Sequence, residues 1–352
     1  MVKKITIEDF FHYRKQFPVI DVRSPSEFNK GHIPGAYNIP LFNDEERAEV
    51  GTVYKQNGKE KAIKLGYRIV SPKLVSFSKQ GEQIAGKEKG LVVHCWRGGM
   101  RSENMAWLFS RSGIECFVLE GGYRAYRRYG RGKLQKPLPL IVLGGMTGSG
   151  KTDILHEMEK SGEQVLNIEK LAFHKGSAFG AIGQPPQYKN EHFENLLFEK
   201  LLKFDHQKPI WVEDESRQIG RNALPDELYA QMRQSQVLKI LLPKKERIKR
   251  LVRDYASYDN SQIIEAIRKV KKRLGDQNAR EAIDALENND YETAVNILLS
   301  YYDKAYKHGL SKRDPSKIFA VSLDEDNPHE NAKEILDFAK EHFFIFQSRM
   351  AG

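Results

Sequence analysis

Short apolar runs alternate with longer amphipathic stretches along most of the chain. Residues 19–22, 91–94 and 115–119 are rich in Val, Ile, Leu and Phe, which is typical of buried strands. Helix-like segments separate these runs. Strands that alternate with helices favour an α/β fold with a parallel sheet. The first third of the chain is therefore expected to form a parallel-sheet domain.

The same alternation begins again near residue 138. Strands are expected at 138–143, 164–168, 210–212, 237–242 and 318–323, and a helix at Lys151–Lys160. From about 244 to 308 the apolar residues recur at helical spacing, which predicts a helical portion. The second part of the chain is therefore expected to be another α/β domain with a helical extension.

A basic stretch, AYRRYGRGKLQKPL at 125–138, separates the two patterns and lacks apolar periodicity. Its Arg, Lys, Gly and Pro content indicates a linker. We therefore predict a first domain at 1–128, a basic linker at 129–138 and a second domain at 139–352. No run of about 18 apolar residues is present, so no membrane span is expected. The first residues also lack the apolar stretch of an export signal.

The composition narrows the class of protein. The net charge is +10, and residues 1–138 hold 25 Lys and Arg against 14 Asp and Glu. A basic surface favours a polyanionic partner such as nucleic acid, although solubility alone also explains such a charge. The two cysteines, Cys95 and Cys116, are too few for a disulfide framework or a zinc site, and they fit a cytoplasmic location.

The stretch GGMTGSGKT at 144–152 matches the phosphate-loop pattern G-x-x-x-x-G-K-[ST]. An apolar strand precedes it and a helix follows, which is the context that the pattern requires. The candidate phosphate-binding residues are Gly145, Gly148, Ser149, Gly150, Lys151 and Thr152. We expect Lys151 to reach the terminal phosphates and the Thr152 hydroxyl to hold Mg²⁺.

Two further segments belong to this domain's candidate site. Glu213 and Asp214 end the strand at 210–212, where such acids hold a metal or its water shell; a solvated strand end is the alternative. The loop HKGSAFGAIGQPPQ at 174–187 is long and rich in small residues, as functional loops often are. Its candidate substrate-binding residues are His174, Gly176, Ser177, Phe179 and Gly180.

The stretch HCWRGGMRS places Cys95 directly after the strand at 91–94, at the sheet edge where α/β folds put their sites. Two glycines allow backbone N–H groups to turn toward the thiol, and two arginines add positive charge, so the loop favours a thiolate. The candidate active-site loop comprises Trp96, Arg97, Gly98, Gly99, Met100 and Arg101 around the catalytic candidate Cys95. Cys116 lies inside an apolar strand and is expected in the core.

Three segments together resemble a rhodanese domain over roughly residues 5–128. These are DVRSPSEF at 21–28, GHIPGAYNIP at 31–40 and the Cys95 loop. The resemblance implies that Cys95 carries sulfur or selenium as a persulfide or selenopersulfide. Asp21 and Arg23 leave their strand at the same edge and either brace the loop or form an ordinary ion pair.

A rhodanese-like domain ahead of a phosphate loop, together with HKGSAFG and WVEDESRQIG, resembles the tRNA 2-selenouridine synthase family over the whole chain. The resemblance implies a transferase that replaces the sulfur of wobble 2-thiouridine in tRNA by selenium from selenophosphate. It also implies an S-geranylated intermediate made from geranyl diphosphate, whose diphosphate the phosphate loop would bind with Mg²⁺. From the composition of the loop alone, we also expect apolar residues near 174–187, such as Phe173 and Phe179, to house the geranyl chain. An enzyme that supplies selenophosphate is an implied partner.

Arginines interleaved with tyrosines before and within the predicted linker are candidates for tRNA contact, since RNA recognition combines charge with stacking. They are Arg124, Arg127, Arg128 and Arg131. A flexible basic linker is the alternative reading of this stretch. Two other functions stay open: a sulfurtransferase fused to an ATP-dependent kinase or ATPase that acts on RNA or a small molecule, and a regulatory module without enzymatic activity. An intact Cys95 loop argues against the regulatory module.

Overall fold

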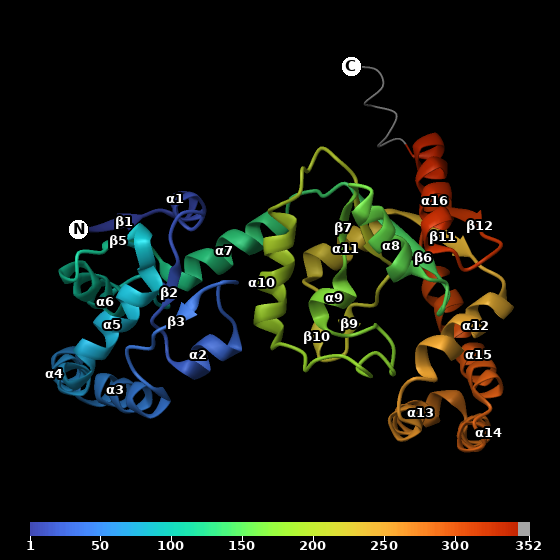
Figure 1. Cartoon of the computed structure of the whole chain (residues 1–352), viewed down its shortest axis with the longest axis horizontal. Coiled ribbons are helices and arrows are strands. Elements are labelled where there is room, and N and C mark those ends of the chain that lie inside the picture. Colours follow the sequence, from blue (N-terminus) through green and yellow to red (C-terminus); the bar gives the residue numbers. More distant parts are fainter. Residues whose placement is uncertain (344–352) are drawn as a thin grey trace. The chain divides into compact units, whose positions relative to one another are not determined.

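The computed structural model describes residues 1–343 and divides into two compact units. Unit 1 comprises Met1–Lys133 together with Lys189–Phe198. Unit 2 comprises Leu134–Tyr188 and the chain from Glu199 onwards. Each unit has a five-stranded sheet whose paired strands are all parallel, which confirms the predicted α/β class (Figure 1).

The sheet of unit 1 has the order β1-β5-β4-β2-β3. Its strands are β1 (Val2–Ile5), β2 (Val19–Asp21), β3 (Tyr37–Asn38), β4 (Gly90–His94) and β5 (Glu115–Leu119). The bounds of β2, β4 and β5 agree with the apolar runs to within one residue. Buried apolar runs of this kind are expected where helices cover both faces of a parallel sheet.

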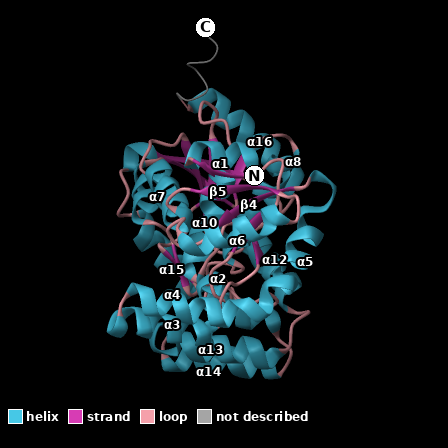
Figure 2. Ribbon diagram, turned by 90° about the vertical axis from the view of Figure 1, so that its left-hand side faces the viewer, coloured by secondary structure: helices cyan, strands magenta, loops and turns pink. Residues whose placement is uncertain are grey.

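Helices cover both faces of this sheet (Figure 2). The helices of unit 1 are α1 (Ile7–Tyr13), α2 (Pro25–Lys30), α3 (Asp44–Asn57), α4 (Lys59–Val70), α5 (Leu74–Ala85), α6 (Met100–Arg111), α7 (Gly122–Leu134) and the first part of α10 (Asn190–Leu201). Leu91 and Val93 of β4 share a core with Phe109 of α6. On the other face, Phe117 of β5 stacks on Tyr13 of α1. Alternate strand residues therefore serve opposite layers.

The sheet of unit 2 has the order β12-β11-β6-β8-β7. Its strands are β6 (Leu140–Gly145), β7 (Gln164–Leu166), β8 (Ile210–Glu213), β11 (Gln236–Leu241) and β12 (Ile318–Ser322). A separate antiparallel pair joins β9 (Gln218–Ile219) to β10 (Asn222–Ala223). Helices α8 (Lys151–Lys160), α9 (Ile168–Ala172), α11 (Asp226–Gln234) and α16 (Pro328–His342) accompany these strands.

The predicted helical portion of unit 2 is present. It consists of α12 (Lys244–Tyr255), α13 (Asn260–Leu274), α14 (Asp276–Glu287) and α15 (Tyr291–Leu310). Ile263, Ile267, Ala282 and Leu298 form part of a common core between them. Helical spacing of apolar residues was therefore a sound indicator here.

The predicted linker at 129–138 differs from the structure, because α7 continues to Leu134. Tyr123 and Tyr126 are fully buried, and Gly130 and Leu134 continue the same buried face. The buried face of α7 consists largely of tyrosines and a glycine. Aliphatic residues therefore do not recur at helical spacing in this stretch, and the helix was not predicted. Among residues 1–343, no helix combines the length and apolar character needed to cross a bilayer.

Candidate active sites in the two units

Cys95 lies in unit 1 at the carboxyl end of β4, in the loop that leads into α6. Gly98 has a φ of 64°, and a Cβ there would lie 2.2 Å from the carbonyl oxygen of Leu119. Only glycine fits such a position, so the loop is held tightly against the residues after β5. The Cys95 residue is 4% exposed. The structure thus gathers the predicted loop around a nearly buried thiol.

Several groups stabilise the Cys95 thiolate. Burial by itself raises the pKa of a thiol, but the Ser102 hydroxyl, the Arg101 charge and the backbone N–H groups of Arg97 and Gly99 lower it by more. The net pKa of Cys95 lies below its ordinary value. The Ser102 hydroxyl lies 3.3 Å from the sulfur and was missed in the sequence. A lowered pKa raises the fraction of thiolate, which is the nucleophilic form of cysteine.

Cys116 has the opposite environment. It is fully buried in β5 within the core beneath α5 and α6. Burial raises the pKa of its thiol to about 12. The prediction that Cys116 is a core residue is confirmed, and the two cysteines of the chain differ sharply in reactivity.

The two arginines of the loop have different roles. Arg101 donates a hydrogen bond of 2.7 Å to the Glu27 carboxylate of α2, so part of its charge is used within the unit. Arg97 is exposed, as is the apolar Met100, and Trp96 is half-buried. Arg97 is therefore the cation of this loop that is most accessible to an anionic substrate.

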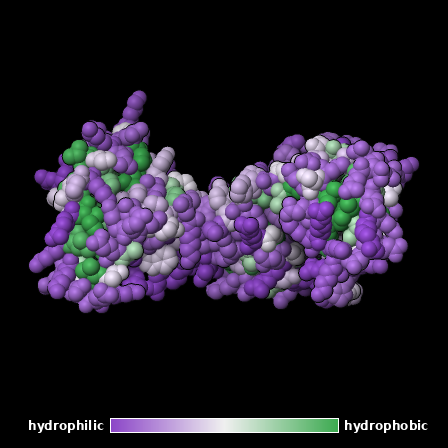
Figure 3. Space-filling view, turned by 90° about the horizontal axis from the view of Figure 1, so that it is seen from below, coloured by the Kyte–Doolittle hydropathy of each residue, from purple (hydrophilic) through white to green (hydrophobic). Residues whose placement is uncertain are grey.

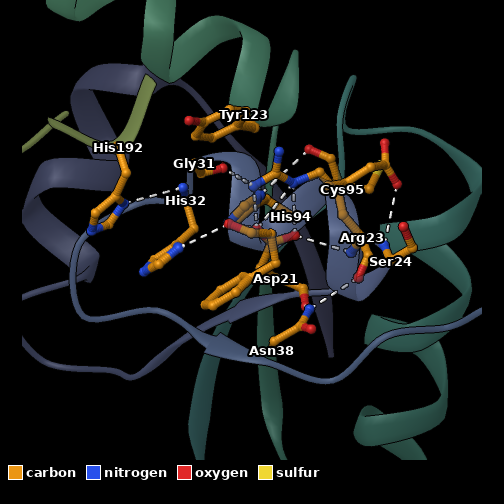
Figure 4. Close-up of polar contacts among 12 residues, drawn as sticks. Asp21, Arg23, Ser24, Gly31, His32, Asn38, His94, Cys95, Tyr123 and His192 are labelled. Carbon is orange, nitrogen blue, oxygen red and sulfur yellow. Dashed lines mark hydrogen bonds and ion pairs between the residues drawn. The ribbon is translucent and has the colours of Figure 1, made fainter. Parts of the chain in front are cut away.

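A buried polar network supports the loop from below (Figure 4). The Arg23 guanidinium donates to the Asp21 carboxylate at 2.6 Å and to the carbonyl oxygen of Gly31 at 2.7 Å. It also lies 3.8 Å from the centre of the Tyr123 ring. His94 is fully buried, with its Nε2 atom 3.8 Å from Asp21. Asp21 and Arg23 therefore form a buried ion pair that holds the end of β2 beside Cys95.

The first part of α10 contributes residues to unit 1 that the sequence did not reveal. Asn195 donates 2.7 Å hydrogen bonds to the carbonyl oxygen of His32 and to the Tyr123 hydroxyl. The ring of His192 lies 4.0 Å from that of His32. These contacts join residues more than 70 positions apart, for which no local pattern gives a signal.

The predicted tRNA-contact residues lie on α7. Arg124, Arg128 and Arg131 are exposed. Arg127 is instead partly buried, donates a 2.7 Å hydrogen bond to Asn195 and pairs with Glu194 of α10. Arg131 also lies 3.9 Å from the Glu194 carboxylate. Arg124 and Arg128 therefore present their charge to solvent, whereas that of Arg127 is compensated inside the unit.

The phosphate loop of unit 2 has the expected strand, loop and helix. It connects β6 to α8, and Gly148 and Gly150 adopt φ values of 78° and 79°. Lys151 Nζ donates to the carbonyl oxygen of Gly145 at 2.9 Å, and the Ser149 side chain is buried. Backbone N–H groups in such a turn at a helix N-terminus suit anionic oxygens.

The acids at the end of β8 differ from the expectation that they face a metal. Glu213 is fully buried and accepts hydrogen bonds from the backbone N–H groups of Ile168 and Glu169 at the start of α9. Asp214 pairs with Arg313 at 2.5 Å. Both side chains thus have structural partners. A strand-end pattern shows where an acid lies, but tertiary contacts decide what it binds.

Glu169 was missed and is the acid that contacts the phosphate-loop helix. The Thr152 hydroxyl donates to Glu169 Oε2 at 3.1 Å. Burial raises the pKa of Glu169, and burial together with the Glu169 charge raises that of Glu213 to about 8. The pKa of Glu215 is also raised, by burial and then by these two neighbours. Within residues 1–343, no cluster of three His, Cys, Asp or Glu side chains could hold a metal by itself.

The loop at 174–187 lies partly against these acids and partly in the core. A Cβ on Gly176 would lie 2.4 Å from Glu215 Oε2, and one on Gly180 would lie 2.7 Å from the His174 ring. Ser177 and Phe179 line a cavity of about 40 Å³ that also touches Thr147 of the phosphate loop. Phe179 itself is 5% exposed. The structure therefore brings the predicted substrate loop beside the phosphate loop.

Comparisons with known proteins add to this geometry. A family model described as the tRNA 2-selenouridine synthase AAA domain matches residues 138–335, and one described as a rhodanese-like domain matches residues 11–129. The chain belongs to the tRNA 2-selenouridine synthase family. Membership of this family confirms the predicted pair of domains and the predicted transferase class.

Relatives in this family match most of the chain. A tRNA 2-selenouridine synthase of Nitrosomonas europaea is 33% identical over 356 residues, covering 87% of this chain and 92% of that protein. One from Proteus mirabilis is 34% identical over 342 residues, covering 88% and 93%. A crystal structure of the N-terminal domain of a Clostridium difficile 630 protein, described as ATP/GTP-binding, is 40% identical with a TM-score of 0.34. That match covers 36% of this chain and 98% of the solved domain.

Proposed function

We propose that this enzyme converts wobble 2-thiouridine in tRNA to 2-selenouridine, with selenophosphate as the selenium donor, through an S-geranylated intermediate made from geranyl diphosphate. The observation that carries the proposal is the presence, in one chain of this family, of a stabilised thiolate at Cys95 and a phosphate-binding loop at Lys151. One site suits chalcogen transfer and the other suits a diphosphate leaving group. Reaction with tRNA fits a cytoplasmic location, where another enzyme supplies selenophosphate.

The phosphate loop would serve the alkylation. The thiouridine sulfur forms a bond to C1 of the geranyl group, the C1–O bond breaks, and diphosphate leaves with its electron pair. The N3 proton of the base is released to solvent. Charge develops on the diphosphate as this bond breaks, and Lys151 with the N–H groups of residues 148–152 stabilises that charge. Alkylation turns the sulfur at C2 into a better leaving group.

Mg²⁺ fits this site as a helper ion. Mg²⁺ in proteins binds one or two side-chain oxygens together with substrate phosphates. The Thr152 hydroxyl and the Glu169 carboxylate lie 3.1 Å apart beside the loop, so two side-chain oxygens of the kind that Mg²⁺ binds stand together there. Thr152 and Glu169 would hold the ion, which when bound would neutralise diphosphate charge.

The Cys95 loop would serve the selenium transfer. The Cys95 thiolate takes the phosphoryl group of selenophosphate and the P–Se bond breaks, which releases selenide. The selenide bonds to C2 as the C2–S bond breaks, geranylthiol leaves with a proton, and N3 of the base takes a proton from solvent. Water then releases the phosphoryl group from Cys95 as phosphate. A selenopersulfide on Cys95, which the rhodanese resemblance implies, would need a two-electron oxidant when selenophosphate is the donor. The transfer written here needs none.

The test uses an anticodon hairpin that carries wobble 2-thiouridine, incubated with geranyl diphosphate and selenophosphate. Nucleosides are then identified by mass spectrometry. The wild-type protein should yield 2-selenouridine, Cys95→Ala should stop at S-geranyl-2-thiouridine, and Lys151→Ala should leave 2-thiouridine. Consumption of ATP with the thiouridine untouched would instead favour a sulfurtransferase fused to a kinase or ATPase.

A further inference from the structure

A large groove lies beside Cys95 in unit 1. It has a volume of about 1320 Å³ and is formed by α3, α4, α6 and the Cys95 loop. Sites for small ligands usually measure about 300–1,000 Å³, so the groove is ample for a substrate group. The alkylation and selenium-transfer steps above use only its edge, at Cys95.

The lining of this groove is unusually apolar for an accessible surface. Five of its side chains are large, hydrophobic and exposed: Tyr54, Tyr67, Leu74, Met100 and Trp107. Tyr67 and Trp107 are 58% and 60% exposed. In Figure 3 a band of hydrophobic residues crosses unit 1 on the side where α3 and α4 lie. Exposed apolar patches of this extent mark binding surfaces.

The rim of the groove carries positive charge. Seven lysines and arginines line it against two glutamates. Arg23 is buried against Asp21 and Arg101 pairs with Glu27, so the accessible charge comes chiefly from Lys55, Lys59 and Arg97. An apolar floor with a basic rim suits a ligand that joins a hydrocarbon chain to a polyanion. A lipid phosphate also joins these two features, but only a chain attached to the reacting base makes use of the Cys95 thiol that lines the same groove.

We propose that this groove binds the geranyl chain of the S-geranylated wobble uridine and thereby places C2 of that base at Cys95. The proposal rests on the proposed function, because it takes S-geranyl-tRNA as the intermediate. Cys95 lines the groove, so a chain lying in it has its sulfur-bearing end at the thiol. The basic rim faces the RNA phosphates. The occupant is thus a ten-carbon chain attached to RNA.

The alternative location for the chain, in unit 2, has much less room. The cavity beside Phe179 measures about 40 Å³, which is space for about three water molecules. Phe179 is itself packed into the core with Ile182 and Ile267. Residues 174–187 can line the phosphate-loop site without holding the whole chain. The groove in unit 1 provides the larger apolar surface.

This assignment gives the groove a role in the order of the reaction. Plain 2-thiouridine has no chain to fill the groove, so its C2 would be bound weakly at Cys95. The geranylated base gains the contacts and is retained until geranylthiol leaves. Alkylation before selenium transfer is then enforced by recognition as well as by leaving-group chemistry.

Direct binding tests this proposal without requiring turnover. Anticodon hairpins bearing wobble S-geranyl-2-thiouridine or S-methyl-2-thiouridine are titrated with the full-length protein, and fluorescence anisotropy reports each Kd. The wild-type protein should bind the geranylated hairpin about tenfold or more tightly. Tyr67→Ser and Trp107→Ser should each remove most of that preference and leave the Kd of the methylated hairpin unchanged. Both residues are exposed, so the variants should fold.

Tyr37→Ser is the matched control, because Tyr37 is 53% exposed in the same unit and does not line the groove. It should keep the wild-type preference. Equal affinity of wild-type protein for both hairpins, or a preference that survives both groove substitutions, would overturn the proposal. Turnover of the same hairpins with selenophosphate decides the proposed function separately. If the geranylated hairpin yields no selenouridine but the binding preference is intact, the proposed function is rejected, whereas binding of the geranyl chain in the groove is supported.

Discussion

Ser102 is the residue that most directly tunes the Cys95 thiol. Its hydroxyl donates to the sulfur at 3.3 Å from the first turn of α6, and it is fully buried. A hydrogen bond to a charged group contributes about 1.5–3 kcal/mol, and 1.36 kcal/mol corresponds to one pH unit. The thiolate is the deprotonated form, so loss of this bond makes it form only at higher pH.

We predict that Ser102→Ala raises the pKa of Cys95 and slows its alkylation at neutral pH by about tenfold or more. The rate of alkylation by iodoacetamide against pH measures this, and the acid limb of selenium transfer should move upward with it. Cys116, whose pKa is about 12, should stay unlabelled and serves as the internal control. An unchanged alkylation profile would show that Arg101 and the backbone N–H groups are sufficient.

The pKa of Glu213 depends on Glu169, a neighbour that the sequence analysis did not predict. Its pKa of about 8 comes from burial and then from the charge of Glu169. A carboxyl whose folded pKa is raised stabilises the fold at low pH, and that contribution is lost as pH rises through the folded value. The stability of unit 2 should therefore fall between about pH 5 and 8.

We predict that Glu169→Gln lowers the pKa of Glu213 and flattens this fall in stability. Urea denaturation at a series of pH values measures it. Glu334→Gln, on the exposed surface of α16, is the control and should keep the wild-type slope. The same slope in Glu169→Gln would mean that burial alone sets the pKa of Glu213.

At the scale of elements, α7 combines a structural face with a charged one. Tyr123 and Tyr126 are buried while Arg124 and Arg128 are exposed on the same helix. Arg127 lies between these faces and pairs with α10. The sequence analysis predicted tRNA contact for all four arginines. On the helix, successive side chains are rotated by about 100° about the axis, so these arginines point in different directions.

We predict that Arg128→Ala weakens tRNA binding to a similar degree for different tRNA sequences and lowers the salt dependence by about one phosphate contact. Filter binding at several salt concentrations measures both quantities. Lys340→Ala on α16 is the control for a change in net charge alone. Arg127→Ala should act differently, by reducing the stability of unit 1. If Arg128→Ala leaves the salt dependence of tRNA binding unchanged, Arg128 of α7 does not contact the RNA.

At the scale of the whole molecule, the division of the chain into units does not follow the chain's order. Lys189–Phe198 lies in sequence within the second domain but belongs to unit 1. Asn195 is 1% exposed and holds both His32 and Tyr123, which lies over the Arg23 guanidinium. The rhodanese-like unit is therefore completed by residues from beyond the phosphate loop.

We predict that Asn195→Ala destabilises unit 1 by about 1–3 kcal/mol, because it leaves buried partners without a hydrogen bond. Differential scanning calorimetry of the full chain should show an earlier transition, and the buried Cys116 thiol should become reactive at a lower temperature. Asn296→Ala, at an exposed position of α15, should leave both unchanged. Unchanged Cys116 reactivity in Asn195→Ala would show that α10 does not contribute to the stability of unit 1.

Local patterns determined much of this protein. Apolar runs located β2, β4, β5 and β8, and the spacing of GGMTGSGKT and HCWRGGMRS located both candidate sites, because strand period, helix period and tight turns depend on neighbouring residues. The difference between Cys95 and Cys116 followed from their immediate neighbours in the same way.

Only the tertiary structure decided which distant groups meet. It paired Asp214 with Arg313, set Glu169 beside Thr152, folded Asn195 into unit 1 and opened the groove between α3, α4 and α6. These contacts join residues far apart in the chain, and their partners are chosen by burial, charge and shape in three dimensions. A one-dimensional pattern carries no record of that choice, so the sequence showed where the chemistry lies and the fold showed what surrounds it.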